Sequence, residues 1–318
     1  MAFRYINPGY VSLLDSDCTA IELIDSTYSR TGVAFRQTGY RKGITISEFA
    51  QGDEFWAKFN WYLPPEEGYY HVYCSAPATY RYGLYIVLQL RWGMYQIGSV
   101  MAGYPSGNTS NDFAATLEDS GLKLGTINRI LFHLVFGDAA TAYMECTINN
   151  IKLPRSTGRS IPYNAKNNGK VAELYSTDGA TAISNVILSD QEISIREDVV
   201  ALPITATDTD MTAGENGLYI ADAANQSLLQ SVDAATLGAI HGINSPVTGV
   251  ALVGNPAYKT TKGEASLTSL SKSGGIVTEH DSFSLSDDTE SVIQSCRTLS
   301  NTTIADLQKM QFGWKAGA

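Results

Sequence analysis

The acidic residues closest to a catalytic arrangement are Glu48, Asp53 and Glu54. Acid–base cleavage of a glycosidic bond needs two carboxylates that face one cleft. Side chains two residues apart share a face of a strand, whereas consecutive side chains point to opposite faces. Asp53 and Glu54 are consecutive, so the spacing does not favour a catalytic pair.

The other residues with catalytic potential are isolated along the chain. Ser-His-Asp chemistry needs spatial proximity that a sequence cannot show, and no nucleophile elbow, P-loop or Rossmann fingerprint is present. His133 lies within an apolar strand, where we expect a buried histidine with satisfied hydrogen bonds. The remaining histidines and the four cysteines show no metal-ligand spacing; they are His71, His241, His280, Cys18, Cys74, Cys146 and Cys296. We therefore predict that the protein is not an enzyme and that Cys146 is a buried free thiol.

Aromatic residues suggest a different kind of site. Tyr80, Tyr82, Arg91, Trp92 and Tyr104 gather in expected loops and strand ends. Exposed aromatic rings stack on sugars, with nearby charges fixing the hydroxyl groups. Tyrosine and tryptophan also concentrate in protein interfaces and in cores. These residues are candidates for glycan binding or for an interface, and core packing is the third alternative.

The elements that position these residues are short β-strands. Ile127–Pro154 predicts a meander in which Phe132, Leu134, Met144 and Cys146 face one core. No segment of ten residues has a helical period. One shorter helix is expected at Ile304–Met310, with Thr302 or Thr303 as its cap. This pattern predicts an all-β sandwich or barrel.

The length and composition of the chain limit the number of domains and the kinds of partner that it can bind. The chain has 318 residues, and its aromatic content falls near Glu197, so we expect one domain at 1–197 and a smaller β-rich domain at 198–318. A net charge of −10 without a basic run disfavours nucleic acid. No apolar run approaches the ~20 residues of a membrane span, and the N-terminus lacks the apolar region of a secretory signal. We expect synthesis in a cytoplasm, with assembly into a particle as one route of release.

The first part of the chain resembles a known fold family. The order of motifs is GITISEF, DEFWAKFNWYL, RILFHLVF, MECTINNIKL and AISNVILSD, ending at Asp190. This order resembles the concanavalin A-like lectin/glucanase jelly roll and, within it, laminin G-like modules. The resemblance covers roughly residues 1–195 and implies two antiparallel sheets packed as a sandwich. Glucanases of this fold carry two glutamates and an aspartate on one strand, and the chain lacks that arrangement.

The resemblance also raises the question of calcium. Laminin G-like modules often hold one ion through aspartates and loop carbonyls at the rim of the sandwich. Asp138 and Asp178, each in an expected turn, are the candidate ligands. Solvated turn aspartates without metal are the alternative.

A second resemblance concerns the whole chain. The uncleaved N-terminus, the β-rich second part and the ending DLQKMQFGWK are similar to phage and prophage virion proteins. This implies a virion structural protein of a tail, fibre or capsid surface, which assembles with copies of itself and other virion proteins and is exposed outside the cell after release. The alternative is a carbohydrate-binding module that attaches to a host-surface glycan. A glycan-cleaving enzyme is the third hypothesis.

Overall fold

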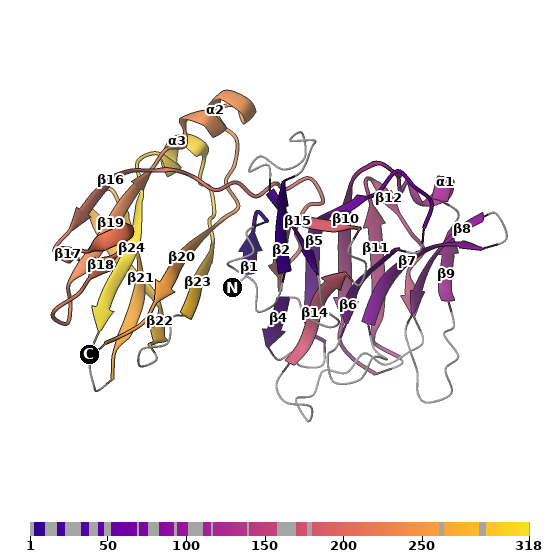
Figure 1. The fold of residues 1–318 in the computed structure, drawn as a ribbon, viewed down its shortest axis with the longest axis horizontal. Coiled ribbons are helices and arrows are strands. Elements are labelled where there is room, and N and C mark those ends of the chain that lie inside the picture. The colour runs from indigo at the N-terminus through magenta and orange to yellow at the C-terminus, as the bar shows by residue number, and fades with distance from the viewer. Residues whose placement is uncertain are drawn as a thin grey trace. The chain divides into compact units, whose positions relative to one another are not determined.

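The structure is a computed structural model of the chain. It describes residues 3–9, 18–22, 33–37, 44–47, 52–68, 70–75, 83–91, 94–100, 111–115, 117–138, 140–157, 170–176, 180–260, 264–285 and 291–317. The chain divides into two compact units, Met1–Val200 and Ala201–Ala318, which Figure 1 draws in indigo to pink and in orange to yellow. Each unit is built from antiparallel sheets, which confirms the prediction of an all-β jelly-roll sandwich followed by a β-rich domain with a short helix near its end.

The described residues of the N-terminal unit form two sheets. Sheet A has nine strands in the order β12-β11-β10-β5-β15-β3-β2, with β1 beside β15 and β13 beside β11. Sheet B has six strands in the order β4-β14-β6-β7-β8-β9. The strands of sheet A are β1 (Phe3–Asn7), β2 (Cys18–Glu22), β3 (Val33–Gln37), β5 (Glu54–Leu63), β10 (Thr126–Val135), β11 (Tyr143–Ile148), β12 (Ile151–Lys152), β13 (Ser156–Thr157) and β15 (Ala182–Ser189). Those of sheet B are β4 (Ile44–Ser47), β6 (Tyr70–Ser75), β7 (Gly83–Arg91), β8 (Met94–Val100), β9 (Asn111–Ala115) and β14 (Lys170–Ser176), and helix α1 (Leu117–Ser120) follows β9.

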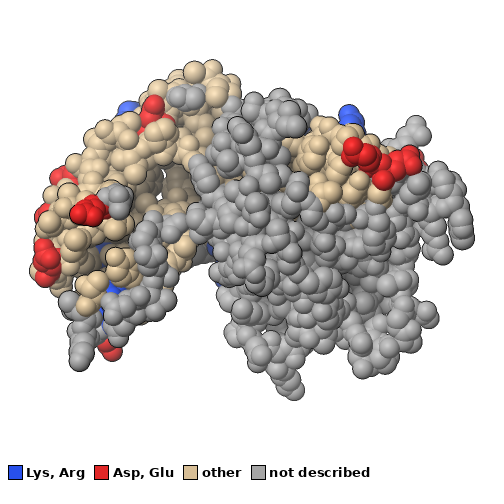
Figure 2. All heavy atoms as spheres, in the orientation of Figure 1, with Lys and Arg blue, Asp and Glu red and all other residues tan. Residues whose placement is uncertain are grey.

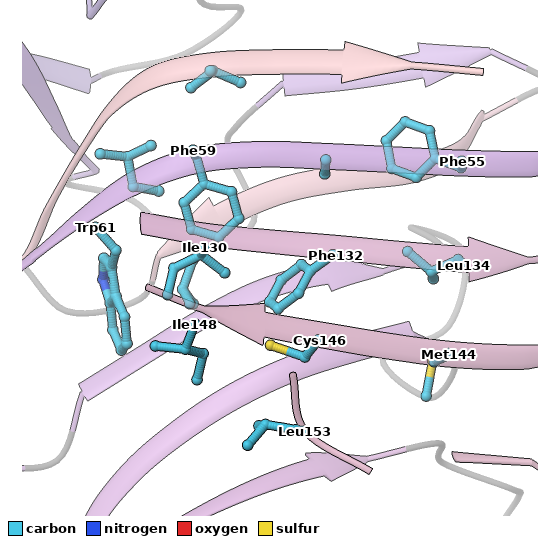
Figure 3. Packing of buried hydrophobic residues seen from close by; sticks show 14 of the residues in the cluster. Phe55, Phe59, Trp61, Ile130, Phe132, Leu134, Met144, Cys146, Ile148 and Leu153 are labelled. Carbon is cyan, nitrogen blue, oxygen red and sulfur yellow. The ribbon is translucent and has the colours of Figure 1, made fainter. Parts of the chain in front are cut away.

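The core lies between the two sheets. Alternate residues of β5, β10 and β11 point to one side, where Phe59 and Phe132 meet edge to face with ring centroids 5.4 Å apart (Figure 3). Val72 of sheet B joins the same buried cluster, which shows that the sheets pack face to face. Cys146 is fully buried in this cluster as a free thiol, as predicted.

The turns around this core follow from local chemistry. Asn149 has a φ of +56° in the turn after β11, a conformation that asparagine tolerates better than most residues. Its side-chain amide donates to the carbonyl of Gly121 at 2.7 Å and so ties the turn to the segment after α1. The amide of Gly52, whose φ is +87°, donates to the carbonyl of Phe136 at 2.7 Å and joins the start of β5 to the end of β10.

Within the described residues, the C-terminal unit has a five-stranded sheet in the order β16-β19-β24-β21-β22, a short pair of β17 and β18, and a separate pair of β20 and β23. Trp314 of β24 and Ile293 of β23 share one buried cluster, so the pair packs against the larger sheet. The elements are β16 (Ile204–Thr209), β17 (Thr212–Ala213), η2 (Glu215–Gly217), β18 (Tyr219–Ile220), β19 (Ser227–Val232), α2 (Ala235–His241), β20 (Gly249–Ala257), β21 (Ser266–Ser273), β22 (Ile276–Ser284), β23 (Ser291–Thr298), α3 (Ile304–Leu307) and β24 (Gln311–Gly317). Helix α3 begins with a capping box formed by Thr303 and Asp306, as the sequence predicted.

Among the described residues, no helix is long and apolar enough to span a membrane. Among the described residues on the face that Figure 2 draws, acidic side chains are more prominent than basic ones, in line with the net charge of −10.

Candidate functional site

The strongest group of polar side chains lies on the outer face of sheet A, which is the face turned away from the core. Because the odd-numbered residues of β5 fill the core, Glu54 and Trp56 point to the outer face. The strand register then places Trp56 opposite His133 of β10, and His133 opposite Glu145 of β11. We call the whole group the His133 cluster; its members are Glu54, Trp56, His133, Tyr143, Glu145, Lys152 and Arg155.

His133 is at the centre of this cluster. Its Nε2 lies 3.0 Å from Oε2 of Glu54, and its Nδ1 lies 3.2 Å from Oε2 of Glu145. A protonated ring donates to both carboxylates, whereas a neutral ring can donate to only one. The imidazole stacks on Trp56 with ring centroids 3.6 Å apart and planes 7° from parallel. Both nitrogens and one ring face of His133 are therefore fixed by contacts, as we expected for a buried and satisfied histidine.

Glu145 collects the positive charges of the cluster. Its Oε1 accepts from Nη2 of Arg155 at 2.7 Å and lies 3.0 Å from Nζ of Lys152. Burial acts to raise the pKa of Glu145, but hydrogen bonds from Lys152, Arg155 and His133 outweigh it and lower the pKa to about 2. Glu145 is therefore an ionised anchor for two cations at neutral pH.

The path of the chain after β11 explains how those cations reach the outer face. Lys152 of β12 lies opposite Thr147, and β13 pairs with the other end of β11. Between these two short strands, the amide of Leu153 donates to the carbonyl of Cys146 at 2.9 Å and its side chain is buried. Arg155 lies within this interruption and reaches across to Glu145.

The rim of the cluster is open to solvent. The side chains of Glu54, Arg155 and Lys152 are 48%, 49% and 60% exposed. The guanidinium of Arg155 lies 3.9 Å above the ring of Tyr143. Burial, followed by the charge of Glu54, raises the pKa of Tyr143, so its hydroxyl stays protonated. The cluster thus presents several hydrogen-bond donors and one carboxylate acceptor, held in place by contacts beneath them.

A second polar group lies in the C-terminal unit. Oγ of Ser271 is 2.9 Å from Nε2 of His280 and accepts from Nη1 of Arg297 at 2.7 Å. Burial, followed by the charge of Arg297, lowers the pKa of His280. Ser271 is buried and belongs to the interior of the unit, so this group has less access to a ligand than the His133 cluster has.

The residues that the sequence selected are mostly not placed. Tyr80, Tyr82, Trp92, Tyr104 and Asp178 lie outside the described residues. Arg91 is the last residue of β7, and its side chain is not described.

Asp138 is placed in the turn after β10. Its Oδ1 accepts from the amides of Ala140 and Thr141 at 3.0 Å and from the hydroxyl of Thr141 at 2.8 Å. The hydroxyl of Thr141, together with these amides, lowers the pKa of Asp138. Among the described residues, no three His, Cys, Asp or Glu side chains are grouped to hold a metal. Calcium at this turn stays a prediction.

Comparison with known proteins gives matches only among solved structures; no family model and no curated protein matches the chain. The chain is similar to endo-beta-1,4-glucuronan lyase from Trichoderma reesei, with 13% identity over 59% of this chain and 95% of that one and a TM-score of 0.39. It is also similar to alginate lyase Aly36B, with 11% identity over 59% of this chain and 95% of that one and a TM-score of 0.38. A third similar structure is the carbohydrate recognition domain of Emp47p, with 8% identity over 58% of this chain and 94% of that one and a TM-score of 0.38.

Two of these three proteins are lyases, which contradicts the prediction that the protein is not an enzyme. We withdraw that prediction, and enzymatic cleavage becomes an activity to be measured. At this identity and TM-score, the likeness carries no argument about the ligand of this chain. The function proposed below therefore rests on the His133 cluster.

Proposed function

We propose that the N-terminal unit binds a saccharide on the outer face of sheet A, through the His133 cluster. The observation that carries this proposal is the in-register row of Trp56, His133 and Glu145 beneath the half-exposed Arg155 and Lys152. Saccharide hydroxyls need closely spaced donors and acceptors, and a site gains affinity when these groups are already held in position. Contacts to His133 and Glu145 supply that preorganisation.

The exposed donors are the groups that would meet the ligand. Arg155 and Lys152 both point at one oxygen of Glu145 and still expose about half of their side chains. Hydrogen bonds from charged donors contribute about 1.5–3 kcal/mol each. Removing both cations is therefore expected to weaken binding at least tenfold.

The test is a glycan array with the full chain, followed by titration of any saccharide that it retains. The site variant is Lys152→Met combined with Arg155→Met. Lys123→Met is the matched control, because Lys123 is an exposed lysine of the same unit outside the cluster. The proposal requires weaker binding by the double variant and unchanged binding by the control. It fails if the wild type retains no saccharide, or if the double variant binds like the wild type.

The same saccharides serve to measure cleavage. Formation of an unsaturated product, followed by ultraviolet absorbance, would show lyase activity in addition to binding. Loss of activity in the double variant would then place the reaction at the His133 cluster.

We propose second that the C-terminal unit attaches the protein to an assembly made of copies of this chain, such as the tail, fibre or surface of a phage virion. The exposed apolar side chains of the C-terminal unit favour this proposal. Of the exposed large apolar side chains among the described residues, all but Ile151 belong to this unit: Ile204, Ile220, Ile240, Ile243, Ile276, Val277 and Val292. Light scattering tests the proposal. It requires an oligomer that Ile276→Ser with Val277→Ser weakens, and a wild type that stays monomeric over the accessible concentrations refutes it.

A further inference from the structure

The segment Asp190–Val200 lies against the outer face of sheet A beside the His133 cluster. Lys58 is on this face, two residues after Trp56, and is completely buried. Its Nζ is 4.0 Å from Oδ1 of Asp198, which places that part of the segment over Lys58. The segment forms no helix or strand, and its apolar contacts come chiefly from Ile193 and Val199, which are buried. We call it the strap.

The polar contacts around Asp198, near the end of the strap, are long, whereas Asp190 at its start accepts from Nε of Arg4 at 2.9 Å. Asp198 shares its carboxylate between Lys58 at 4.0 Å and Nη2 of Arg129 at 3.4 Å. The amide of Val199 donates to Oδ1 of Asn185 at 3.3 Å, and Nδ2 of Asn185 donates to Oδ1 of Asp198 at 3.4 Å. Ideal hydrogen bonds and ion pairs between such groups are shorter, near 2.7–2.9 Å for charged pairs. By these distances, the part of the strap around Asp198 is held less tightly than its start at Asp190.

The residue that anchors the strap, Asn185, has a left-handed backbone conformation, which asparagine tolerates better than most residues. Asn185 has a φ of +52° inside β15, where the register of the strand shifts between Ser184 and Ile187. Its carbonyl accepts from Nζ of Lys58 at 3.5 Å, so this residue contacts both the strap and the lysine below it.

Burial of the Lys58 ammonium group also favours opening of the strap. Burial lowers the pKa of Lys58 to about 8, against the attraction of Asp198, and Arg129 lowers it further. A lysine that is charged at neutral pH is therefore kept from water by a segment without regular structure. Exposure of the ammonium group to water would relieve this desolvation.

We propose that the strap lifts from the outer face in the folded protein and uncovers Lys58, which extends the binding face beyond the His133 cluster. The extension rests on the proposed saccharide binding, whereas the lifting of the strap does not.

The test measures how fast an amine-reactive acylating reagent modifies Lys58 in the native full chain, by peptide mass spectrometry. Asp198→Asn and Val199→Ala each remove one contact of the strap. Two variants are used so that the test still stands if one of them does not fold. Glu192→Gln is the matched control, since Glu192 is an exposed carboxylate of the strap. Lys123 gives the rate for an exposed lysine, and alkylation of the buried Cys146 reports unfolding of the core.

The expected result is that Lys58 reacts about tenfold faster in Val199→Ala than in the wild type. Asp198→Asn should also react faster, but loss of this carboxylate lowers the pKa of Lys58 as well, so Val199→Ala is the decisive variant. Cys146 and the Glu192→Gln control should keep the wild-type rates. The proposal is overturned if Lys58 reacts at the wild-type rate in the strap variants, or only in step with Cys146, because the strap would then open only when the unit unfolds. Neither outcome involves a saccharide, so failure of the proposed binding leaves this test intact.

Discussion

Replacement of Lys58 by methionine should change how the stability of the N-terminal unit depends on pH. Lys58 is fully buried, and burial lowers its pKa from 10.5 to about 8. Between these values the unfolded chain carries a proton on this lysine and the folded chain does not. The free energy of unfolding therefore rises with pH across the window from about 8 to 10.5.

The size of the effect follows from the two pKa values. A difference between 10.5 and about 8 corresponds to about 3 kcal/mol, at about 1.4 kcal/mol for each pH unit. Below pH 8 the folded protein carries the full cost of the buried ammonium group. Methionine fills a similar volume without a charge, so Lys58→Met should be as stable as the wild type or more stable at neutral pH.

The assay is urea unfolding followed by tryptophan fluorescence at a series of pH values from neutral to above 10.5. The quantity to read is the wild-type free energy of unfolding minus that of Lys58→Met, because the contributions of other titrating groups then cancel. We expect this difference to rise by up to about 3 kcal/mol with increasing pH. A difference that is constant or falls with pH would refute the reasoning, and Lys123→Met should show no such trend.

Three further predictions concern other charged or polar contacts. Hydrogen bonds lower the pKa of Glu145 to about 2 despite its burial. This carboxylate therefore stabilises the fold above pH 4.5, and that stability is lost as the pH falls toward 2. In acid unfolding curves, Glu145→Gln should remove this loss. Burial and Arg297 lower the pKa of His280, so stability of the C-terminal unit should fall as pH drops below 6.5, and His280→Asn should flatten that dependence in thermal melts. Thr303→Ala removes the cap of α3 and should cost about 1 kcal/mol in urea unfolding; no loss would contradict the role of the capping box.

The sequence predicted the parts of the fold that depend on local pattern. Alternation along β5, β10 and β11 identified the core face, and the capping signal at Thr303 located α3. Helix α2 was missed because its N-cap is Ala234, without a side-chain cap hydrogen bond, and Gly238 lies within it. In β22, His280 and Glu279 have partners on other strands, namely Ser271 and Lys315, and these pairings cannot be read from the sequence of β22 alone.

The candidate site could not be predicted because it depends on strand register. Trp56, His133 and Glu145 come from three strands and meet only because β10 pairs with both β5 and β11 in one particular alignment. Alternation assigns each residue to a face, but it does not say which residue of another strand lies opposite. Arg155 depends in addition on the interruption between β12 and β13, where Pro154 signals a break in the ladder but does not show that Arg155 reaches Glu145.

The most direct test of the central claim is an experimental structure of the full chain with a saccharide that the glycan array selects. We expect the saccharide to lie on the outer face of sheet A, with its oxygens within hydrogen-bond distance of Arg155 or Lys152. A saccharide bound on sheet B or on the C-terminal unit, with the His133 cluster empty, would contradict it.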